Sequence, residues 1–148
     1  MEPLKCLLVR PITPAIAVMG SGSFAFVRKA LLDIGFTDIS EADDGAKAWP
    51  MAQDAAAKGI PYGLIISDWN MPILKGIDFL RNVRKDPTIA KTPFVLLTAE
   101  SEMTQVKEAV LAGVSGYLVK PFTPSALKEK LLGVWTNAQR AASATKAA

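Results

Sequence analysis

Three side chains in this 148-residue sequence could together receive a phosphoryl group. Asp68 offers a carboxylate, Thr98 a hydroxyl and Lys120 an ammonium group, and each stands at the end of a short apolar run. A phosphoryl group in transfer spreads negative charge over its oxygens, which fixed donors and cations must meet. Backbone N–H groups after Asp68 and Thr98 would add further bonds. Each residue alone is more often a cap, a turn residue or a solvated side chain, but the combination favours phosphoryl acceptance by Asp68.

Short apolar runs alternate with longer segments of helical period along the chain. We expect helices at about residues 24–34, 45–58, 77–85, 104–112 and 124–136. Strands are expected at 37–41, 64–67, 94–98 and 116–119, after a first strand at either 5–9 or 15–18. This alternation predicts an α/β fold with a doubly wound, five-stranded parallel sheet and helices on both faces. Ligands of such sheets bind at the carboxyl ends of the strands, where the three side chains stand.

Composition excludes several kinds of chemistry. The chain has no histidine, which rules out Ser-His-Asp triads, His-ligated zinc and a phosphohistidine donor role. Its one cysteine, Cys6, permits neither an internal disulfide nor a thiolate cluster. The net charge is only +3 and the basic residues are scattered, so we expect no nucleic-acid partner. No apolar stretch approaches the roughly 20 residues that span a bilayer, and the N-terminus does not resemble a signal peptide, so we expect a cytoplasmic protein without a membrane partner.

Three segments resemble the signature segments of two-component receiver domains, closest to the chemotaxis (CheY-like) branch. They are residues 66–72 (Ile-Ser-Asp-Trp-Asn-Met-Pro), 98–100 (Thr-Ala-Glu) and 116–122 (Gly-Tyr-Leu-Val-Lys-Pro-Phe). The resemblance covers about residues 24–132 and implies the flavodoxin-like strand order 2-1-3-4-5. We therefore expect a receiver domain over residues 1–138 with an atypical segment at 10–23, followed by an Ala/Ser/Thr-rich tail at 139–148.

The resemblance implies a role for each site residue. Asp68 would be the phosphoacceptor and Lys120 would pair with the phosphate. The backbone of Trp69, Asn70 and Ala99 would contact the phosphate. Asp68 and the carbonyl of Asn70 would contribute to a Mg²⁺ site.

Thr98 and Tyr117 would form a coupled switch pair, in which the hydroxyl moves toward the phosphate as the aromatic ring turns inward. The Lys120–Pro121 bond is expected to be cis. The fourth helix, fifth strand and fifth helix would form the surface that contacts a downstream protein. A histidine kinase or phosphotransfer protein would supply the phosphoryl group.

The other tryptophans and acids have simpler interpretations. We expect Trp69 to be a partly exposed lid beside the acceptor, whereas Trp49 and Trp135 should pack on helices. Asp43 and Asp44 follow the second strand and are interpreted as a turn and a helix cap.

The sequence departs from the family at the end of the first strand, where relatives carry a pair of acids that help to hold Mg²⁺. No Asp or Glu occurs between Pro3 and Leu32. A first strand at residues 15–18 puts Val18 and Met19 at the acidic positions.

A first strand at residues 5–9 puts Arg10 and Pro11 there instead. We favour this second register slightly, because its start is more strand-like and Pro11 and Pro14 would interrupt an extension. In that register, Arg10 could pair with Asp68 and hold the domain in one state without metal.

In either register Asp68 is the one carboxylate left for Mg²⁺, so metal binding should be weak or absent and phosphorylation impaired. Lys75 stands where relatives usually carry Asp and adds a cation near the site. The run Gly20-Ser21-Gly22-Ser23 is interpreted as a connector or cap rather than an anion-binding nest.

The favoured function is a stand-alone response regulator, a signalling switch and not an enzyme, with Asp68 as its phosphoacceptor. The first alternative is a degenerate receiver that binds partners without phosphorylation. An engineered or recombined CheY-like protein and a small anion-binding α/β protein are further alternatives.

Overall fold

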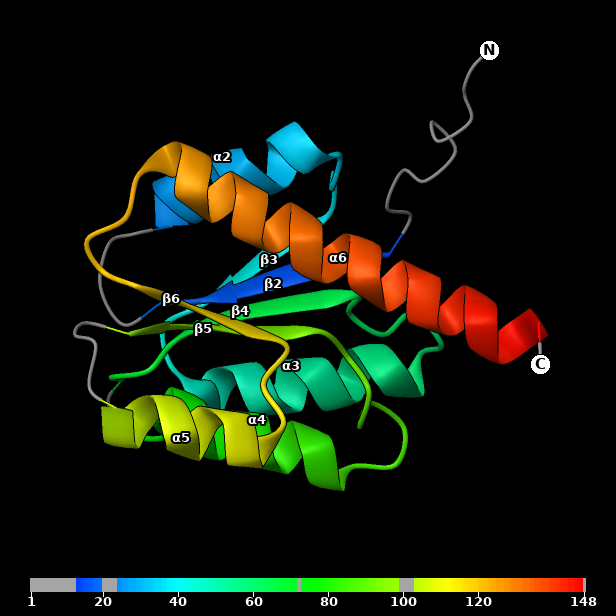
Figure 1. The fold of residues 1–148 in the computed structure, drawn as a ribbon. Coiled ribbons are helices and arrows are strands. Elements are labelled where there is room, and N and C mark those ends of the chain that lie inside the picture. Colours follow the sequence, from blue (N-terminus) through cyan, green and yellow to red (C-terminus); the bar gives the residue numbers. More distant parts are fainter. Residues whose placement is uncertain (1–12, 20–23, 72, 99–102, 148) are drawn as a thin grey trace, which may run out of the picture.

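The computed structural model describes residues 13–19, 24–71, 73–98 and 103–147, with a parallel sheet between two layers of helices (Figure 1). The strands of this sheet are β2 (Ala15–Val18), β3 (Ile39–Ala42), β4 (Leu64–Asp68), β5 (Phe94–Thr98) and β6 (Gly116–Val119). The helices are α2 (Phe24–Ile34), α3 (Gly45–Ala57), α4 (Gly76–Lys85), α5 (Met103–Ala112) and α6 (Pro124–Ala147). The predicted alternation of strands and helices is confirmed.

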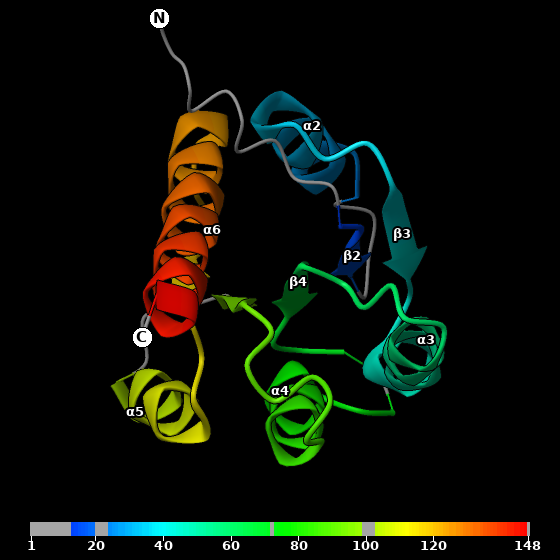
Figure 2. The same ribbon diagram turned by 90° about the vertical axis from the view of Figure 1, so that its right-hand side faces the viewer.

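The five strands lie in the order β3-β2-β4-β5-β6, and all neighbours are parallel. This order is the predicted flavodoxin-like order 2-1-3-4-5. Helices α2 and α6 cover one face of the sheet, and α3, α4 and α5 cover the other (Figures 1 and 2). All carboxyl ends of the strands therefore meet at one edge.

The central strands are apolar because helices cover both of their faces. Every residue of β2, β4 and β5 is buried. On the α3–α5 side, Phe79 packs edge-on against Phe94, with ring centroids 5.4 Å apart. On the α2–α6 side, Phe36 packs against Trp135 at 5.1 Å. Successive residues of each strand alternate between these two layers of core.

The first strand of the sheet is Ala15–Val18, so the preference for residues 5–9 is wrong. Pairing of β2 with both β3 and β4 places it at the centre of the sheet. Four small or branched apolar residues suit that position better than a strand beginning with lysine. Pro14 does not interrupt the ladder, because it precedes the strand and contributes its carbonyl, which accepts a bond from the Gly63 N–H at 2.8 Å. Residues 5–9, Arg10 and Gly20–Ser23 lie outside the described residues.

Helix α6 continues to Ala147, past its expected end near residue 136. Its last turns project beyond the sheet (Figure 1). The segment is rich in alanine, which has the highest helix propensity, so helix is favoured there by local propensity. The expected division between receiver and tail at residue 138 stays a prediction. None of the helices described is both long and apolar enough to cross a membrane.

The side chain of Arg84, near the end of α4, joins two loops at the amino edge of the sheet. Its Nε donates to the carbonyl of Gly113 at 2.8 Å, and Nη1 donates to the carbonyls of Ala90 and Thr92 at 3.0 and 2.6 Å. Nη2 donates to the hydroxyl of Ser115 at 3.3 Å. Burial lowers the pKa of Arg84 from its usual value. The guanidinium therefore positions the segments that lead into β5 and β6.

We expect Arg84→Met to lower the free energy of unfolding by about 2–3 kcal/mol, because three backbone carbonyls lose their donor. Urea denaturation measures the change. Lys85→Met, at the exposed neighbouring position, is the control and should change stability by less than about 0.5 kcal/mol. Equal effects of the two substitutions would contradict the assigned role of Arg84.

Candidate functional site

Asp68 and Lys120 form an ion pair at the carboxyl edge of the sheet. Asp68 ends β4 and Lys120 follows β6, and Lys120 Nζ lies 2.7 Å from Asp68 Oδ1. The side chain of Asp68 is only 5% exposed and that of Lys120 is 36% exposed. A buried carboxylate needs such a partner, because its removal from water is costly. The predicted convergence of these two residues is present in the structure.

Thr98 stands between them in the sheet, because it ends β5, the strand that separates β4 from β6. It is 2% exposed, and its carbonyl accepts a bond from the Lys120 N–H at 2.7 Å. The Lys120–Pro121 bond is cis, as expected. The three predicted residues thus occupy the ends of three adjacent strands.

Thr98 and Tyr117 share one face of the sheet. Tyr117 pairs in register with Leu96, two residues before Thr98, so the two are diagonal neighbours on adjacent strands. Tyr117 is partly buried and packs against the core on the α3–α5 side. This placement connects the end of β5 to the layer that contains α5.

Trp69 is 4% exposed, so the expectation of a partly exposed lid is wrong. Its ring follows the alternation of β4 into the core on the α3–α5 side. The backbone N–H of Trp69 donates to the carbonyl of Leu97 at 2.9 Å. This bond occupies one of the backbone groups predicted from the sequence to contact the phosphate. Asn70 is exposed, and Ala99 lies outside the described residues. Trp135 is buried in the core, and Trp49, which is partly buried, packs against it, so both are packing residues on helices as expected.

The end of β2 offers no ligand for a metal ion. Val18 pairs with Ser67, so Met19 follows beside Asp68, and the Met19 N–H continues the ladder to the carbonyl of Ala42 at 3.1 Å. Met19 belongs to the core cluster on the α2–α6 side, the face toward which Asp68 alternates. Val18 and Met19 are 0% and 1% exposed. A thioether and an isopropyl group thus stand where carboxylates would be needed for Mg²⁺.

The neighbouring acids do not replace the missing pair. Asp44 caps α3 by accepting a bond from the Lys47 N–H at 2.9 Å, and Asp43 pairs with Lys47 Nζ at 2.9 Å. The interpretation as a turn and a helix cap is confirmed. Within the described ranges, no three His, Cys, Asp or Glu side chains gather where they could hold a metal. The side chains that the structure describes at the end of β2 therefore do not fit a tightly held Mg²⁺.

Gly76, at the start of α4, lies close to the main chain of Asp68 and Trp69. The Gly76 N–H donates to the carbonyl of Trp69 at 2.9 Å, and a Cβ on Gly76 would lie 2.1 Å from the carbonyl oxygen of Asp68. Only glycine fits there. Ile73 has a φ of 70° and is 84% exposed. A β-branched residue in this left-handed region is strained, and the sequence carried no signal of that conformation.

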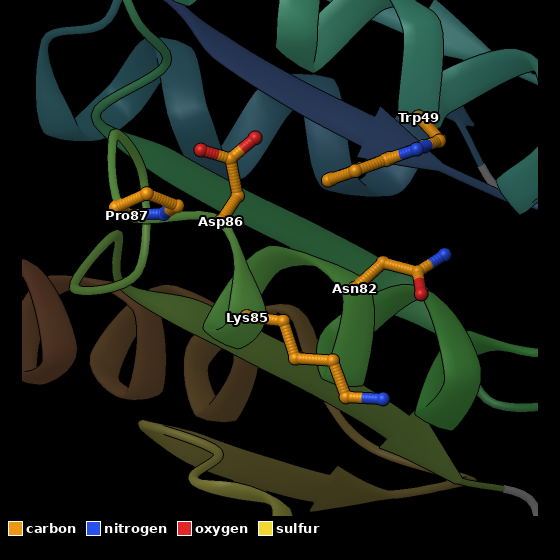
Figure 3. Close-up of a pocket in the computed structure, with 5 residues that line it drawn as sticks. All are labelled: Trp49, Asn82, Lys85, Asp86 and Pro87. Carbon is orange, nitrogen blue, oxygen red and sulfur yellow. The ribbon is translucent and has the colours of Figure 1, made fainter.

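A pocket of about 310 Å³ lies between α3 and α4 and does not coincide with this site (Figure 3). It is lined by Trp49, Asn82, Lys85, Asp86 and Pro87. None of these is a predicted site residue. The pocket is thus separate from the carboxyl edge, where Asp68, Thr98 and Lys120 end three adjacent strands.

Comparison with known proteins agrees with this fold. Residues 22–132 match the model of the response regulator receiver domain, a segment that begins after β2. The chain is 47% identical over 105 residues to chemotaxis protein CheY-3 of Vibrio cholerae, covering 71% of this chain and 77% of that protein. It is 45% identical to chemotaxis protein CheY of Pseudomonas aeruginosa, covering 71% and 81%. The solved structure of V. cholerae CheY4 superimposes with a TM-score of 0.73 at 34% identity, covering 84% of this chain and 99% of that one.

The fold and the carboxyl-edge site thus define a receiver domain. The chain belongs to the response regulator receiver family, and within it to the CheY-like domains of two-component signalling. Receivers are signalling domains that interact with histidine kinases or phosphotransfer proteins, and they typically bind Mg²⁺.

We expect Lys120→Met to lower the free energy of unfolding by about 2 kcal/mol in metal-free buffer, because the Asp68 carboxylate loses its cation. The double variant with Asp68→Asn should recover about 1 kcal/mol of that loss. Lys58→Met removes a fully solvated pair with Asp54 and should cost less than about 0.5 kcal/mol. Strict additivity of Lys120→Met and Asp68→Asn would show that the two side chains do not interact in solution.

Proposed function

We propose that Asp68 accepts a phosphoryl group from a histidine kinase or phosphotransfer protein and that the modified domain acts by contact with a downstream protein. An oxygen of Asp68 bonds to phosphorus as the donor's P–N bond breaks and its electron pair returns to the histidine nitrogen. The observation that carries the proposal is the 2.7 Å pair of Lys120 Nζ and Asp68 Oδ1, with Thr98 at the end of the strand between them. Lys120 would then pair with a phosphoryl oxygen.

Thr98 and Tyr117 act as the switch in this proposal. The Thr98 hydroxyl moves toward the phosphoryl group, and the Tyr117 ring fills the space that it leaves. Their common face of the sheet supports this coupling. The output surface is the face of α5, β6 and α6, where Val110 and Leu111 of α5 are 60% and 88% exposed.

Mg²⁺ binding is weak in the proposed mechanism, because within the described residues Asp68 and the carbonyl of Asn70 are its only candidate protein ligands. Mg²⁺, when bound to a receiver, neutralises charge on the phosphoryl oxygens, an effect on the order of several kcal/mol. This chain must meet that charge with lysine and with N–H and hydroxyl donors. Phosphorylation is therefore slow compared with that of a receiver that carries the acidic pair.

The apolar end of β2 also favours a second candidate function. With Val18 and Met19 at the end of β2, the domain would be a binding module that keeps the receiver surfaces but is not phosphorylated. The Asp68–Lys120 pair would then serve only to hold the carboxyl edge in one state. The two functions differ in whether Asp68 is ever modified.

Incubation with acetyl phosphate, with and without Mg²⁺, decides between them. We expect slow formation of an acid-stable, base-labile phosphoryl adduct that is absent from Asp68→Asn. Asp54→Asn, an exposed aspartate on α3, is the matched control and should label as the natural sequence does. No adduct after prolonged incubation would favour the binding module, and strong acceleration by Mg²⁺ would contradict weak metal binding.

Met19→Asp should create Mg²⁺ binding, because it puts a second carboxylate beside Asp68. Without metal the variant should be less stable by about 2–4 kcal/mol, since a buried carboxylate is added next to another. Millimolar Mg²⁺ should raise its Tm by several degrees more than that of the natural sequence. Adding Asp68→Asn to Met19→Asp should abolish the difference. An equal Mg²⁺ effect on the natural sequence and Met19→Asp would contradict the assigned position of Met19.

A further inference from the structure

We propose that the amino edge of the sheet carries a binding site for a small carboxylate with a short apolar tail, at the end of the sheet opposite Asp68. A pocket of about 230 Å³ lies there, between α6 and the segments that lead into β5 and β6. It is lined by Lys91, Pro93, Ser115, Val134, Asn137 and Ala138. Its volume is below the roughly 300–1,000 Å³ of pockets for drug-sized ligands, so the occupant must be small. This inference does not depend on phosphorylation of Asp68.

The polar side chains around the pocket supply hydrogen-bond donors. Ser115 Oγ already accepts bonds from the Phe94 N–H at 3.0 Å and from Arg84 Nη2 at 3.3 Å. A hydroxyl has two acceptor sites and one donor, so the O–H of Ser115 is left to donate, and the amide of Asn137 can be oriented to donate as well. Lys91 is exposed and forms no ion pair within the described ranges, and its flexible stem can bring the ammonium group to a ligand. Among the described residues that line the pocket none is acidic, so an anion is the complementary ligand.

The guanidinium of Arg84 provides an independent reason for an anion at this place. It is bonded to three backbone carbonyls and to the Ser115 hydroxyl, all of which are neutral. In the part of the chain that the structure describes, Arg84 takes part in no ion pair. Burial lowers the pKa of Arg84, so the surroundings do not fully compensate its charge. An anion bonded to the Ser115 O–H at about 2.7 Å would lie within about 6 Å of Nη2 and would supply part of the missing negative charge.

The apolar walls of the pocket select the rest of the ligand. Pro93, Val134 and Ala138 line it, and Val134 is 8% exposed. A phosphate ion would bring charged oxygens against these side chains, whereas a short alkyl tail would remove apolar surface from water. A monocarboxylate such as butyrate has both parts, an anionic end for the donors and a tail for the walls.

The test titrates the full chain with sodium butyrate, at an ionic strength held constant with sodium chloride, and follows the N–H groups by NMR. We expect saturable shifts of the Ser115 amide, the Asn137 side-chain amide and the Arg84 Nε–H, with a millimolar dissociation constant. Lys91→Met should weaken binding about tenfold, because one charge-assisted hydrogen bond is lost. Lys128→Met removes the same charge from an exposed position of α6 outside the pocket and should change the affinity by less than about twofold.

Formate and phosphate separate the two parts of the ligand. Formate has the charge without the tail and should bind about tenfold more weakly than butyrate, and phosphate should also bind more weakly. Formate or phosphate binding as tightly as butyrate would overturn the assignment to a carboxylate with an apolar tail. Shifts that do not saturate, or equal affinities of Lys91→Met and Lys128→Met, would overturn the site itself. Neither result bears on acceptance of a phosphoryl group by Asp68.

Discussion

The ion pair of Asp68 and Lys120 governs the carboxyl edge of the sheet. A carboxylate that is 5% exposed carries a large desolvation cost, and Lys120 offsets that cost from two strands away. The pair also brings together the two charges that phosphoryl transfer requires. Lys120, which stabilises the unmodified domain, is therefore also the residue proposed to pair with the phosphoryl group. The sheet needs no rearrangement for Lys120 to pair with a phosphoryl oxygen in place of the Asp68 carboxylate.

The apolar end of β2 changes the electrostatics of this edge. Clustered carboxylates repel one another, and a divalent cation bound between them relieves this repulsion. At this edge, by contrast, Asp68 lies beside the apolar Val18 and Met19 and pairs with Lys120. In the proposed function, a phosphoryl group on Asp68 brings additional negative charge, which Lys120 and N–H and hydroxyl donors would have to meet.

The alternation of side chains along the strands connects this edge to both layers of helices. Asp68 and Met19 project toward the layer of α2 and α6, and Thr98 and Tyr117 toward the layer of α3, α4 and α5. A change at Asp68 can therefore affect the opposite face of the sheet through Thr98, the end of the intervening strand. Gly76 and Arg84 hold the two ends of α4 in place, beside the main chain of Asp68 and at the amino edge respectively.

The sequence by itself determined the order of the elements and the placement of Asp68, Thr98 and Lys120 at the ends of three adjacent strands. Buried parallel strands must be apolar, and the polar residues that end them must meet at one edge, so local pattern is sufficient there. Only the tertiary structure decided that Ala15–Val18 is the first strand, that Trp69 is buried and that α6 runs to Ala147. The local pattern is compatible with either of the two candidate first strands, and with either a buried or a partly exposed Trp69 ring. The choice between them depends on which residues pair with β3 and β4 and which side chains the helices cover, and these contacts join segments far apart in the chain.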